Sequence, residues 1–303
     1  MTVATFATAH RQREMDVATL WCPLCRGGSK QPADQDCDAE RMSIGHTVTR
    51  LSITPVKGLL LHHPDSIDLT ASGAVGDRLF YLVDSTGQIQ SCTDNSGLYG
   101  IRADYDSDSR RLEISRDNDV LLSGIVEPAE RVETDMWGLR TIKADSVADP
   151  VWSTFFSDIV GRPVQLLRAR ASAYDVQPVT LLGAASVQEL ARHAGLTRID
   201  SRRFRMLIEF SGGEPHVEDS WDERLLTVGN AVLRSGGPVK RCAAVTRAPD
   251  SGAVDLQTIR LITGYRGRQT SALGIGAHFG VYADVVEPGT ISVGDTLTVG
   301  TDA

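Results

Sequence analysis

The chain has 303 residues, of which 41% are hydrophobic and 23% charged, and its formal net charge at pH 7 is −8. A chain of this length buries enough apolar surface to fold without disulfide bonds, and it has room for two domains. The acidic balance argues against general nucleic-acid binding, because phosphate contacts require a clustered excess of lysine and arginine. No uncharged apolar run is long enough to predict a membrane span.

The five cysteines are an odd number spread over a long chain. This usage predicts a reducing compartment rather than a secreted disulfide framework, so we expect a cytoplasmic protein. Cys22 and Cys25 have the CxxC spacing of zinc ligands, and Cys37 and His46 are candidates for the third and fourth ligand. A single CxxC without a second pair is also a common chance feature, and both interpretations stay open.

Residues 1–45 show no sustained hydrophobic period and include an acidic stretch, which predicts a poorly ordered extension. Met42 is an alternative start, so the residues before it are a candidate mis-assigned leader. We expect an N-terminal β-barrel domain over residues 46–145 and a second domain over residues 146–303.

Short β-type segments separated by turn signals follow the extension. We expect strands at residues 48–54, 66–70, 79–83, 111–115 and 120–123. Asp149 and Pro150 then begin a helix that Gly161 ends, because aspartate is a good N-cap and proline fits the first helical position. Ser186 and Glu189 have the spacing of a capping box, which predicts a second helix over residues 186–193.

The last third of the chain is again rich in predicted strands. They are expected at residues 205–210, 225–228, 231–234 and 290–299, with a third helix over residues 255–262. Strands and helices do not alternate regularly, which disfavours a Rossmann sheet, and no glycine-rich phosphate loop is present. The sequence therefore predicts a mainly β fold of the α+β class with a β-barrel-like body.

Cys242 is the residue whose surroundings best suit chemistry. It follows a predicted strand and lies next to Lys240 and Arg241. A positive neighbourhood favours the thiolate, which attacks electrophiles or binds soft metals. From the local residues alone, a small buried structural cysteine is an equally good interpretation.

Several segments resemble the signature of MOSC domains. In the second half these are Arg203-Phe204-Arg205, Glu218-Asp219-Ser220-Trp221-Asp222, and Arg241-Cys242 followed by Thr246, Pro249 and Ser251-Gly252. In the first half, Thr54-Pro55-Val56-Lys57-Gly58 and Gly76-Asp77-Arg78-Leu79-Phe80 resemble elements of the β-barrel that precedes MOSC in this family. The resemblance covers residues 47–300 in matching order, and it implies a MOSC domain packed with an N-terminal β-barrel domain.

The resemblance also implies a molybdopterin cofactor (Mo-molybdopterin) whose molybdenum is ligated by Cys242. It assigns cofactor contacts to Lys57, Gly58, Arg78, Arg205, Arg241 and Cys242. Taken without the family, Lys57, Arg78 and Arg205 are equally well interpreted as solvated surface charges. We expect Arg78 and Arg205 to lie in strands, where alternate residues point inward, and this favours buried anchoring roles for both.

Asp175 matches the aspartate that lies close to the metal in the amidoxime-reducing relatives. By this resemblance Asp175 is a candidate catalytic residue that donates or positions a proton. The alternative is an aspartate that only caps a loop. Four departures from the family pattern bear on cofactor binding. Met206-Leu207 replaces Pro-Asn, Gly58 replaces serine, Ser91-Cys92-Thr93-Asp94 replaces a threonine-arginine segment, and Ala248 replaces an acidic residue.

The resemblance implies an oxidoreductase similar to the amidoxime-reducing component, which reduces N-hydroxylated or N-oxide compounds. The chain has neither a ferredoxin cysteine spacing nor a dinucleotide fingerprint, so electrons must come from a separate ferredoxin, flavoprotein or cytochrome-type partner. The alternative is a sulfur carrier or sulfurtransferase in which Cys242 carries a persulfide. A non-catalytic cofactor-binding or scaffold protein is the third hypothesis.

Overall fold

A closed barrel of seven strands, in the order β1-β13-β12-β18-β15-β14-β20, organises the fold. The computed structural model describes residues 45–271 and 273–300, which belong to one unit spanning residues 42–303. The barrel strands are β1 (His46–Leu51), β12 (Val179–Gly183), β13 (Ile208–Ser211), β14 (Leu225–Val228), β15 (Ala231–Lys240), β18 (His278–Glu287) and β20 (Thr296–Val299). The predicted mainly β fold with a barrel body is confirmed.

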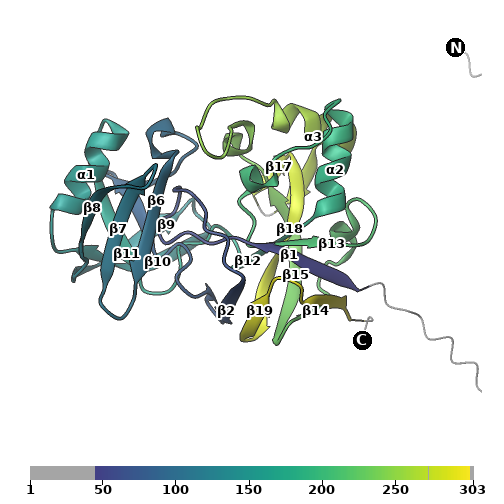
Figure 1. Ribbon diagram of the computed structural model, residues 1–303, viewed down its shortest axis with the longest axis horizontal. Coiled ribbons are helices and arrows are strands. Elements are labelled where there is room, and N and C mark those ends of the chain that lie inside the picture. Colours follow the sequence, from purple (N-terminus) through teal and green to yellow (C-terminus); the bar gives the residue numbers. More distant parts are fainter. Residues whose placement is uncertain (1–44, 272, 301–303) are drawn as a thin grey trace, which may run out of the picture. The chain divides into compact units, whose positions relative to one another are not determined.

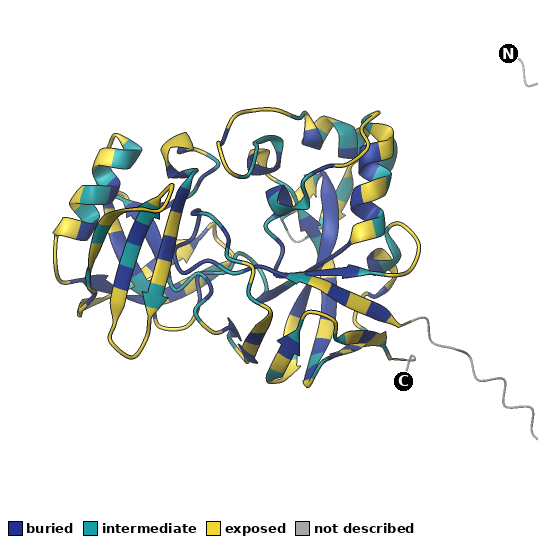
Figure 2. Cartoon of the chain, in the orientation of Figure 1, coloured by how far each residue is buried: buried dark blue, intermediate teal, exposed yellow. Residues whose placement is uncertain are grey.

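The barrel combines the first described strand with strands from the second half of the chain. β1 pairs antiparallel with both β13 and β20, whereas β12 and β13 are parallel (Figure 1). Alternation of buried and exposed residues along β1 turns Val48 inward, where it packs with Leu181, Phe210 and Leu226 (Figure 2). The apolar period of two therefore accounts for the barrel interior.

A second core lies between a five-stranded sheet and a three-stranded sheet. The first has the order β5-β4-β11-β10-β9, and the second is β6-β7-β8. Their bounds are β4 (Phe80–Asp84), β5 (Ile89–Gln90), β6 (Ile101–Asp106), β7 (Arg111–Arg116), β8 (Asp119–Ile125), β9 (Pro128–Met136), β10 (Arg140–Val147) and β11 (Val164–Ala169). Helix α1 (Val151–Val160) packs on β11 and places Trp152 and Phe156 in this core. The division of the chain near residue 145 stays a proposal.

The remaining elements are short. Strands β2 (Ser66–Thr70), β3 (Gly73–Ala74) and β19 (Gly289–Ser292) form one small sheet, and β16 (Gln269–Ser271) pairs with β17 (Gly274–Gly276). Helices α2 (Ala184–His193) and α3 (Thr258–Arg266) lie side by side (Figure 1). The 3-10 turns are η1 (Ser96–Leu98), η2 (Ser201–Phe204), η3 (Val217–Ser220) and η4 (Ala243–Thr246).

The described residues contain three α-helices, as predicted, but two of the helices begin at other residues than expected. The α1 prediction holds, since the Val151 N–H donates to Asp149 at 2.9 Å and Gly161 ends the helix with φ +76°. The capping box is wrong, because α2 begins two residues earlier and the buried Ser186 hydroxyl donates to the Glu218 carboxylate at 2.8 Å. Helix α3 also begins and ends later than predicted, over Thr258–Arg266.

The strand predictions fail where the backbone turns. Arg78 and Arg205 have φ values of 49° and 54°, so both lie in left-handed turn conformations rather than in strands. The predicted strand over residues 290–299 is two strands, β19 and β20, separated at Gly294 with φ +95°. The sequence also gives no prediction for β9, which is mostly exposed, or for β18, whose first six residues are all buried. β18 lacks the alternation that identifies a half-buried strand, and in β9 the alternation is confined to residues 132–136.

The candidate zinc ligands Cys22, Cys25 and Cys37, together with Met42, lie outside the described residues. The fourth candidate, His46, is buried with its Nδ1 atom 3.1 Å from the carbonyl oxygen of Gly212. Within residues 45–271 and 273–300, no group of three or more metal-ligating side chains is arranged to hold a metal ion. No helix in the same ranges has the length and apolar character needed to cross a membrane.

Candidate functional site

The exposed Cys242 thiol lies at the wall of the larger described cavity. It directly follows β15 and Arg241 and precedes η4, and the Thr93 hydroxyl is 3.4 Å from its sulfur atom. The cavity has a volume of 480 Å³, which lies within the range of small-molecule and cofactor sites. The structure therefore places the one exposed cysteine of the described residues where a ligand has room to bind.

The cavity brings together all the residues predicted for the site from the sequence. They come from both halves of the chain and are Lys57, Gly58, Arg78, Asp175, Arg205, Arg241 and Cys242. Aromatic side chains complete the lining, namely Trp137, Tyr174, Phe204 and Tyr282. Six cationic side chains, which include Arg203 and Lys240, and the exposed Cys242 thiol on a partly aromatic surface form a site suited to an anionic, planar ligand.

The Arg241 guanidinium donates hydrogen bonds mainly to backbone carbonyl groups. Its Nε donates to the carbonyl of Phe279 at 2.8 Å, and its Nη1 donates to the carbonyl of Phe204 at 3.0 Å. Burial lowers the pKa of Arg241 to about 10. Arg241 thus fixes the end of β15, and with it the backbone position of Cys242, against two neighbouring segments.

Arg203 fixes the other side of the Cys242 loop. Its side chain is only 5% exposed, and it makes a two-pronged ion pair with Asp255 at 3.0 Å for each contact. A third bond runs from Nη1 to the carbonyl of Val245, in η4, at 3.1 Å. Because η4 directly follows Cys242, these bonds restrict the loop that carries the thiol.

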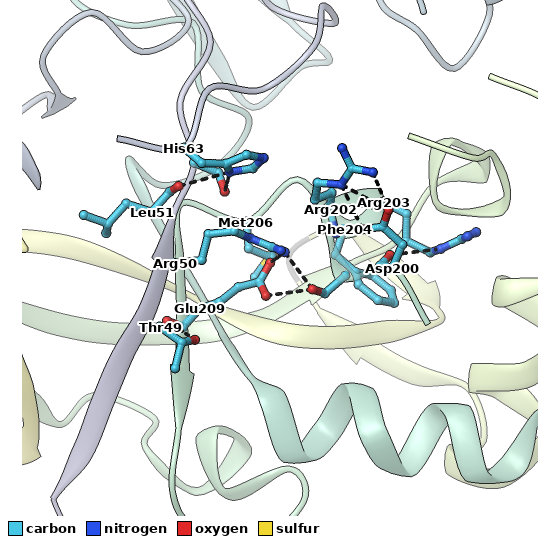
Figure 3. Close-up of polar contacts among 12 residues, drawn as sticks. Thr49, Arg50, Leu51, His63, Asp200, Arg202, Arg203, Phe204, Met206 and Glu209 are labelled. Carbon is cyan, nitrogen blue, oxygen red and sulfur yellow. Dashed lines mark hydrogen bonds and ion pairs between the residues drawn. The ribbon is translucent and has the colours of Figure 1, made fainter. Parts of the chain in front are cut away.

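A polar network anchors the segment that supplies Arg203 and Arg205 (Figure 3). Asp200 accepts a hydrogen bond from the Arg202 N–H at 3.0 Å and so caps η2. Next to it, the Ser201 hydroxyl donates to Glu209 at 2.8 Å, and Arg50 of β1 forms an ion pair with the same carboxylate. The η2 turn is therefore tied to two barrel strands.

Arg78 and Arg205 reach the cavity from their turns rather than from strands. Arg78 forms an ion pair with Asp77, and its Nη2 donates to the carbonyl of Arg205 at 3.1 Å. Arg205 in turn donates from Nη2 to the carbonyl of Leu59 at 2.7 Å. Although burial opposes it, the Asp77 and Asp175 carboxylates raise the pKa of Arg78, which stays charged.

Lys57 and Asp175 form an ion pair at the same cavity. The ammonium also donates to the carbonyl of Ala173 at 2.9 Å. Burial lowers the pKa of Lys57, an effect that the Asp175 carboxylate partly offsets. Burial acts to raise the pKa of Asp175, but the Lys57 ammonium and two arginines outweigh it and leave this pKa below its usual value. Asp175 is therefore ionised at neutral pH, and the Lys57 ammonium is more acidic than that of a solvated lysine.

Two family models match consecutive parts of the chain. The family model described as MOSC N-terminal beta barrel domain matches residues 45–163, and the model described as MOSC domain matches residues 168–298. The chain belongs to the MOSC-domain family. Its membership confirms the resemblance noted in the sequence, including the order of the two domains.

This MOSC protein is similar in sequence to curated proteins of two different names. Mitochondrial amidoxime-reducing component 1 of Homo sapiens is 27% identical over 281 residues, which cover 83% of this chain and 82% of the human protein. Molybdenum cofactor sulfurase of Oryza sativa subsp. japonica is 27% identical over 275 residues, which cover 78% of this chain but only 32% of the rice protein. The solved structure of the YUAD protein from Bacillus subtilis aligns with a TM-score of 0.42 at 14% identity, covering 86% of this chain and 98% of that one.

The structure gives a reason for one departure from the MOSC pattern. Gly58, which replaces the serine of related barrels, has φ +95°, and a Cβ atom placed there would lie 3.2 Å from the backbone nitrogen of Cys92. A side chain at this position is disfavoured both by the backbone conformation and by the close approach. The glycine is thus required by the local fold of this chain.

The Met206-Leu207 departure is also accommodated by the fold. Met206 is buried, and its sulfur accepts a hydrogen bond from Arg241 Nη2 at 2.7 Å. Leu207 is buried as well, and its N–H donates to the Thr180 hydroxyl at 2.9 Å. Both residues therefore support the Arg241 and barrel positions instead of supplying an amide to the cavity.

Several cavity residues were not predicted from the sequence. Thr93 belongs to a segment that departs from the family pattern, and Tyr174 directly precedes Asp175, so a local signal existed for both. Trp137 carried no such signal. A second cavity of 70 Å³ shares Arg203, Arg205 and Ala244 with the larger one. Three further arginines line it, namely Arg102, Arg202 and Arg247, so the site has an arginine-rich end.

Proposed function

We propose that this MOSC protein binds a molybdenum cofactor through Cys242 and reduces N-hydroxylated or N-oxide compounds. The observation that carries the proposal is an exposed thiol at the wall of a 480 Å³ cavity that six cationic side chains also line. The relatives named amidoxime-reducing component, which align over most of their own length, support the reaction class.

The donor set of the cavity fits such a cofactor. A thiolate is a soft ligand suited to a sulfur-rich molybdenum centre, and this assigns Cys242 to the metal. Guanidinium groups suit the phosphate of the pterin, which assigns Arg78 and Arg205 to that anion. When bound, the cofactor would supply the two electrons for reductive N–O cleavage. Arg241 and Arg203 contribute by holding the Cys242 loop in place.

The Lys57–Asp175 pair is proposed to manage protons. Reductive cleavage of an N–O bond consumes two electrons and two protons and releases the oxygen as water. Lys57 is the proton donor in this proposal, because burial lowers the pKa of its ammonium toward the working range of a general acid. Asp175, which stays ionised beside it, acts as a positioning residue that orients the ammonium.

The electrons are proposed to come from a separate protein of the ferredoxin, flavoprotein or cytochrome type. The sequence supplies no iron–sulfur or dinucleotide motif of its own. A cytoplasmic location belongs to the same proposal and rests on the odd, dispersed cysteine count.

The second candidate is a sulfur carrier or sulfurtransferase that uses a Cys242 persulfide. Exposure of the thiol favours it, because a persulfide must be reached by a donor and an acceptor. Relatives named molybdenum cofactor sulfurase share this region, but the alignment spans only 32% of the rice protein. A sulfur donor protein would have to act in trans.

The deciding experiment measures molybdenum and pterin in protein purified from a host that makes the cofactor. Wild type is compared with Cys242→Ala and with Cys92→Ala, a matched control for the buried cysteine beside the cavity. We expect stoichiometric molybdenum in wild type and Cys92→Ala and its loss in Cys242→Ala. Metal-free wild type with cyanide-releasable sulfur would establish the sulfur-carrier alternative. Neither signal would indicate the non-catalytic scaffold.

A further inference from the structure

Trp137 occupies an unusual backbone position at the tip of the β9–β10 hairpin. The turn is closed by the Leu139 N–H, which donates to the Met136 carbonyl at 2.9 Å. Both central residues have positive φ, 51° at Trp137 and 73° at Gly138. Turns of this kind favour asparagine or glycine at the first central position, whereas a bulky aromatic residue is disfavoured there. The tryptophan therefore carries a backbone cost that the hairpin itself does not require.

The indole is also left largely unburied. Trp137 is 50% exposed, whereas Trp152 and Trp221, the other described tryptophans, are 1% and 2% exposed. Trp137 nevertheless lines the cavity that holds Cys242. Neither the local turn nor apolar packing accounts for this side chain, but contact with a ligand in the cavity does.

The surroundings of the ring specify which part of a ligand it meets. The ammonium of Lys57 lies 5.5 Å from the centroid of the Trp137 ring, so the indole is next to the proposed proton donor. Tyr174, another aromatic residue of the lining, already has the Arg140 guanidinium 3.8 Å from its ring centroid. Trp137 is thus the aromatic surface next to Lys57 that remains half exposed for stacking.

The two ends of the cavity differ in charge and therefore suit different parts of a ligand. Arg203 and Arg205 belong to the end that adjoins the second, arginine-rich cavity, and anions are bound most favourably there. Near Trp137 the charges of Lys57 and Arg78 are each paired with a carboxylate, of Asp175 and Asp77, and the Arg140 guanidinium lies over the Tyr174 ring. This end of the cavity therefore attracts anions less than the arginine-rich end, which suits it to an uncharged group.

We propose that Trp137 is a specificity-determining residue that stacks on planar, uncharged N-hydroxylated substrates such as aromatic amidoximes. The inference rests on the proposed function for the identity of the reacting group. It goes beyond that function by naming the side chain that selects ring-bearing substrates over alkyl ones. An alkyl amidoxime has the same reacting group but no ring to stack on the indole.

The test compares the binding of benzamidoxime and acetamidoxime to the full chain by calorimetry and by tryptophan fluorescence. The variants are Trp137→Ala, Trp137→Phe and the control Leu139→Ala, which alters a 38% exposed residue of the same hairpin. In Trp137→Ala we expect the Kd for benzamidoxime to rise about 5- to 10-fold and that for acetamidoxime to change less than about 2-fold. Trp137→Phe restores most of the affinity and abolishes the ligand-dependent fluorescence change. Leu139→Ala behaves like wild type.

Molybdenum content is measured in every sample, which separates this inference from the proposed function. Selective loss of benzamidoxime affinity supports the inference whether or not the wild type contains metal, whereas metal-free wild type overturns the proposed function alone. Equal losses for both ligands, no loss for either, or no benzamidoxime binding to wild type would overturn the inference. Loss of molybdenum in Trp137→Ala would also overturn it, because the ring would then serve the cofactor.

Discussion

Two groups of cations border the Cys242 cavity, and they differ in what they bind. Arg203 and Arg241 donate to backbone carbonyls of Val245, Phe204 and Phe279, so their charge is used within the protein. Lys57 also donates to a carbonyl, that of Ala173, but its ion-pair partner Asp175 lines the cavity, whereas Asp255, the partner of Arg203, does not. The arginines that flank the family's cysteine therefore shape the site, while the pair across the cavity is the one able to react.

The chemistry of the two side chains explains this difference. A guanidinium has five N–H donors in a fixed plane and stays charged, so it suits a buried position between several acceptors. An ammonium is a single point of charge whose pKa shifts on burial, which suits proton transfer. The comparison predicts losses of activity from changes at Lys57 and losses of stability from changes at Arg203.

The largest effect is expected from Lys57→Met. Removing a general acid lowers kcat by about 100-fold or more, because the N–O cleavage step then lacks its proton donor. Folding stability should change by less than about 1 kcal/mol, since the variant removes a buried charge and leaves Asp175 partly exposed. The measurement is kcat per bound molybdenum together with urea unfolding.

Lys240→Met is the matched control for this comparison, because Lys240 also lines the cavity but donates to the carbonyl of Leu273 at 2.7 Å. Its kcat should stay within about 3-fold of wild type. Equal losses in the two lysine variants would show that Lys57 has no special role in proton transfer.

Arg203→Met is expected to destabilise the fold by about 2–3 kcal/mol. The variant leaves the Val245 carbonyl and the Asp255 carboxylate without their guanidinium partner. Arg202→Met is the control, because Arg202 is 32% exposed and its ion pairs with Asp200 and Asp250 should contribute less than about 1 kcal/mol. Similar unfolding free energies for the two variants would refute the scaffold role of Arg203.

The fold could be predicted from sequence for some strands that bury one face and expose the other, although β6, which alternates in the same way, was not predicted. β14 (Leu225–Val228) has this alternation and was predicted with the right bounds. β9 and β18 were not, because the first is mostly exposed and the second is buried on both faces over much of its length. Their pairing depends on partners distant in the chain, which local periodicity does not report.

The candidate site was predictable as a set of residues but not as a set of contacts. Short motifs identified Lys57, Arg78, Arg205 and Cys242, and all four line one cavity. Whether a guanidinium faces a carbonyl or a ligand depends on tertiary packing, as the turn conformations of Arg78 and Arg205 illustrate. Trp137 was missed for the same reason, since its place in the cavity depends on the β9–β10 turn.

A smaller effect is expected from Gly58→Ala, which tests whether the cavity lining next to Lys57 accepts a side chain at this position. Its φ of +95° and the 3.2 Å approach of a Cβ to Cys92 both oppose a side chain, and together they should cost about 1–2 kcal/mol of folding stability. Gly87→Ala is the control, because it has φ +81° but open space around the Cβ position. We expect urea unfolding to show a larger cost at Gly58. Equal costs would mean that the Cys92 contact relaxes freely.

The smallest expected effect is a displacement of the alkaline limb of the kcat–pH profile in Asp175→Asn. Activity that requires the Lys57 ammonium is present below the pKa of Lys57 and is lost as pH rises through it. The Asp175 carboxylate raises this pKa, against burial and the nearby Arg78 charge, which lower it. Removing the carboxylate therefore lowers the pKa of Lys57 further and moves the alkaline limb to lower pH. Profiles of kcat per molybdenum for wild type and Asp175→Asn provide the measurement. If the alkaline limb does not move, the proton donor is a group other than Lys57. A shift of this limb toward lower pH indicates that Asp175 positions the ammonium and does not donate the proton itself.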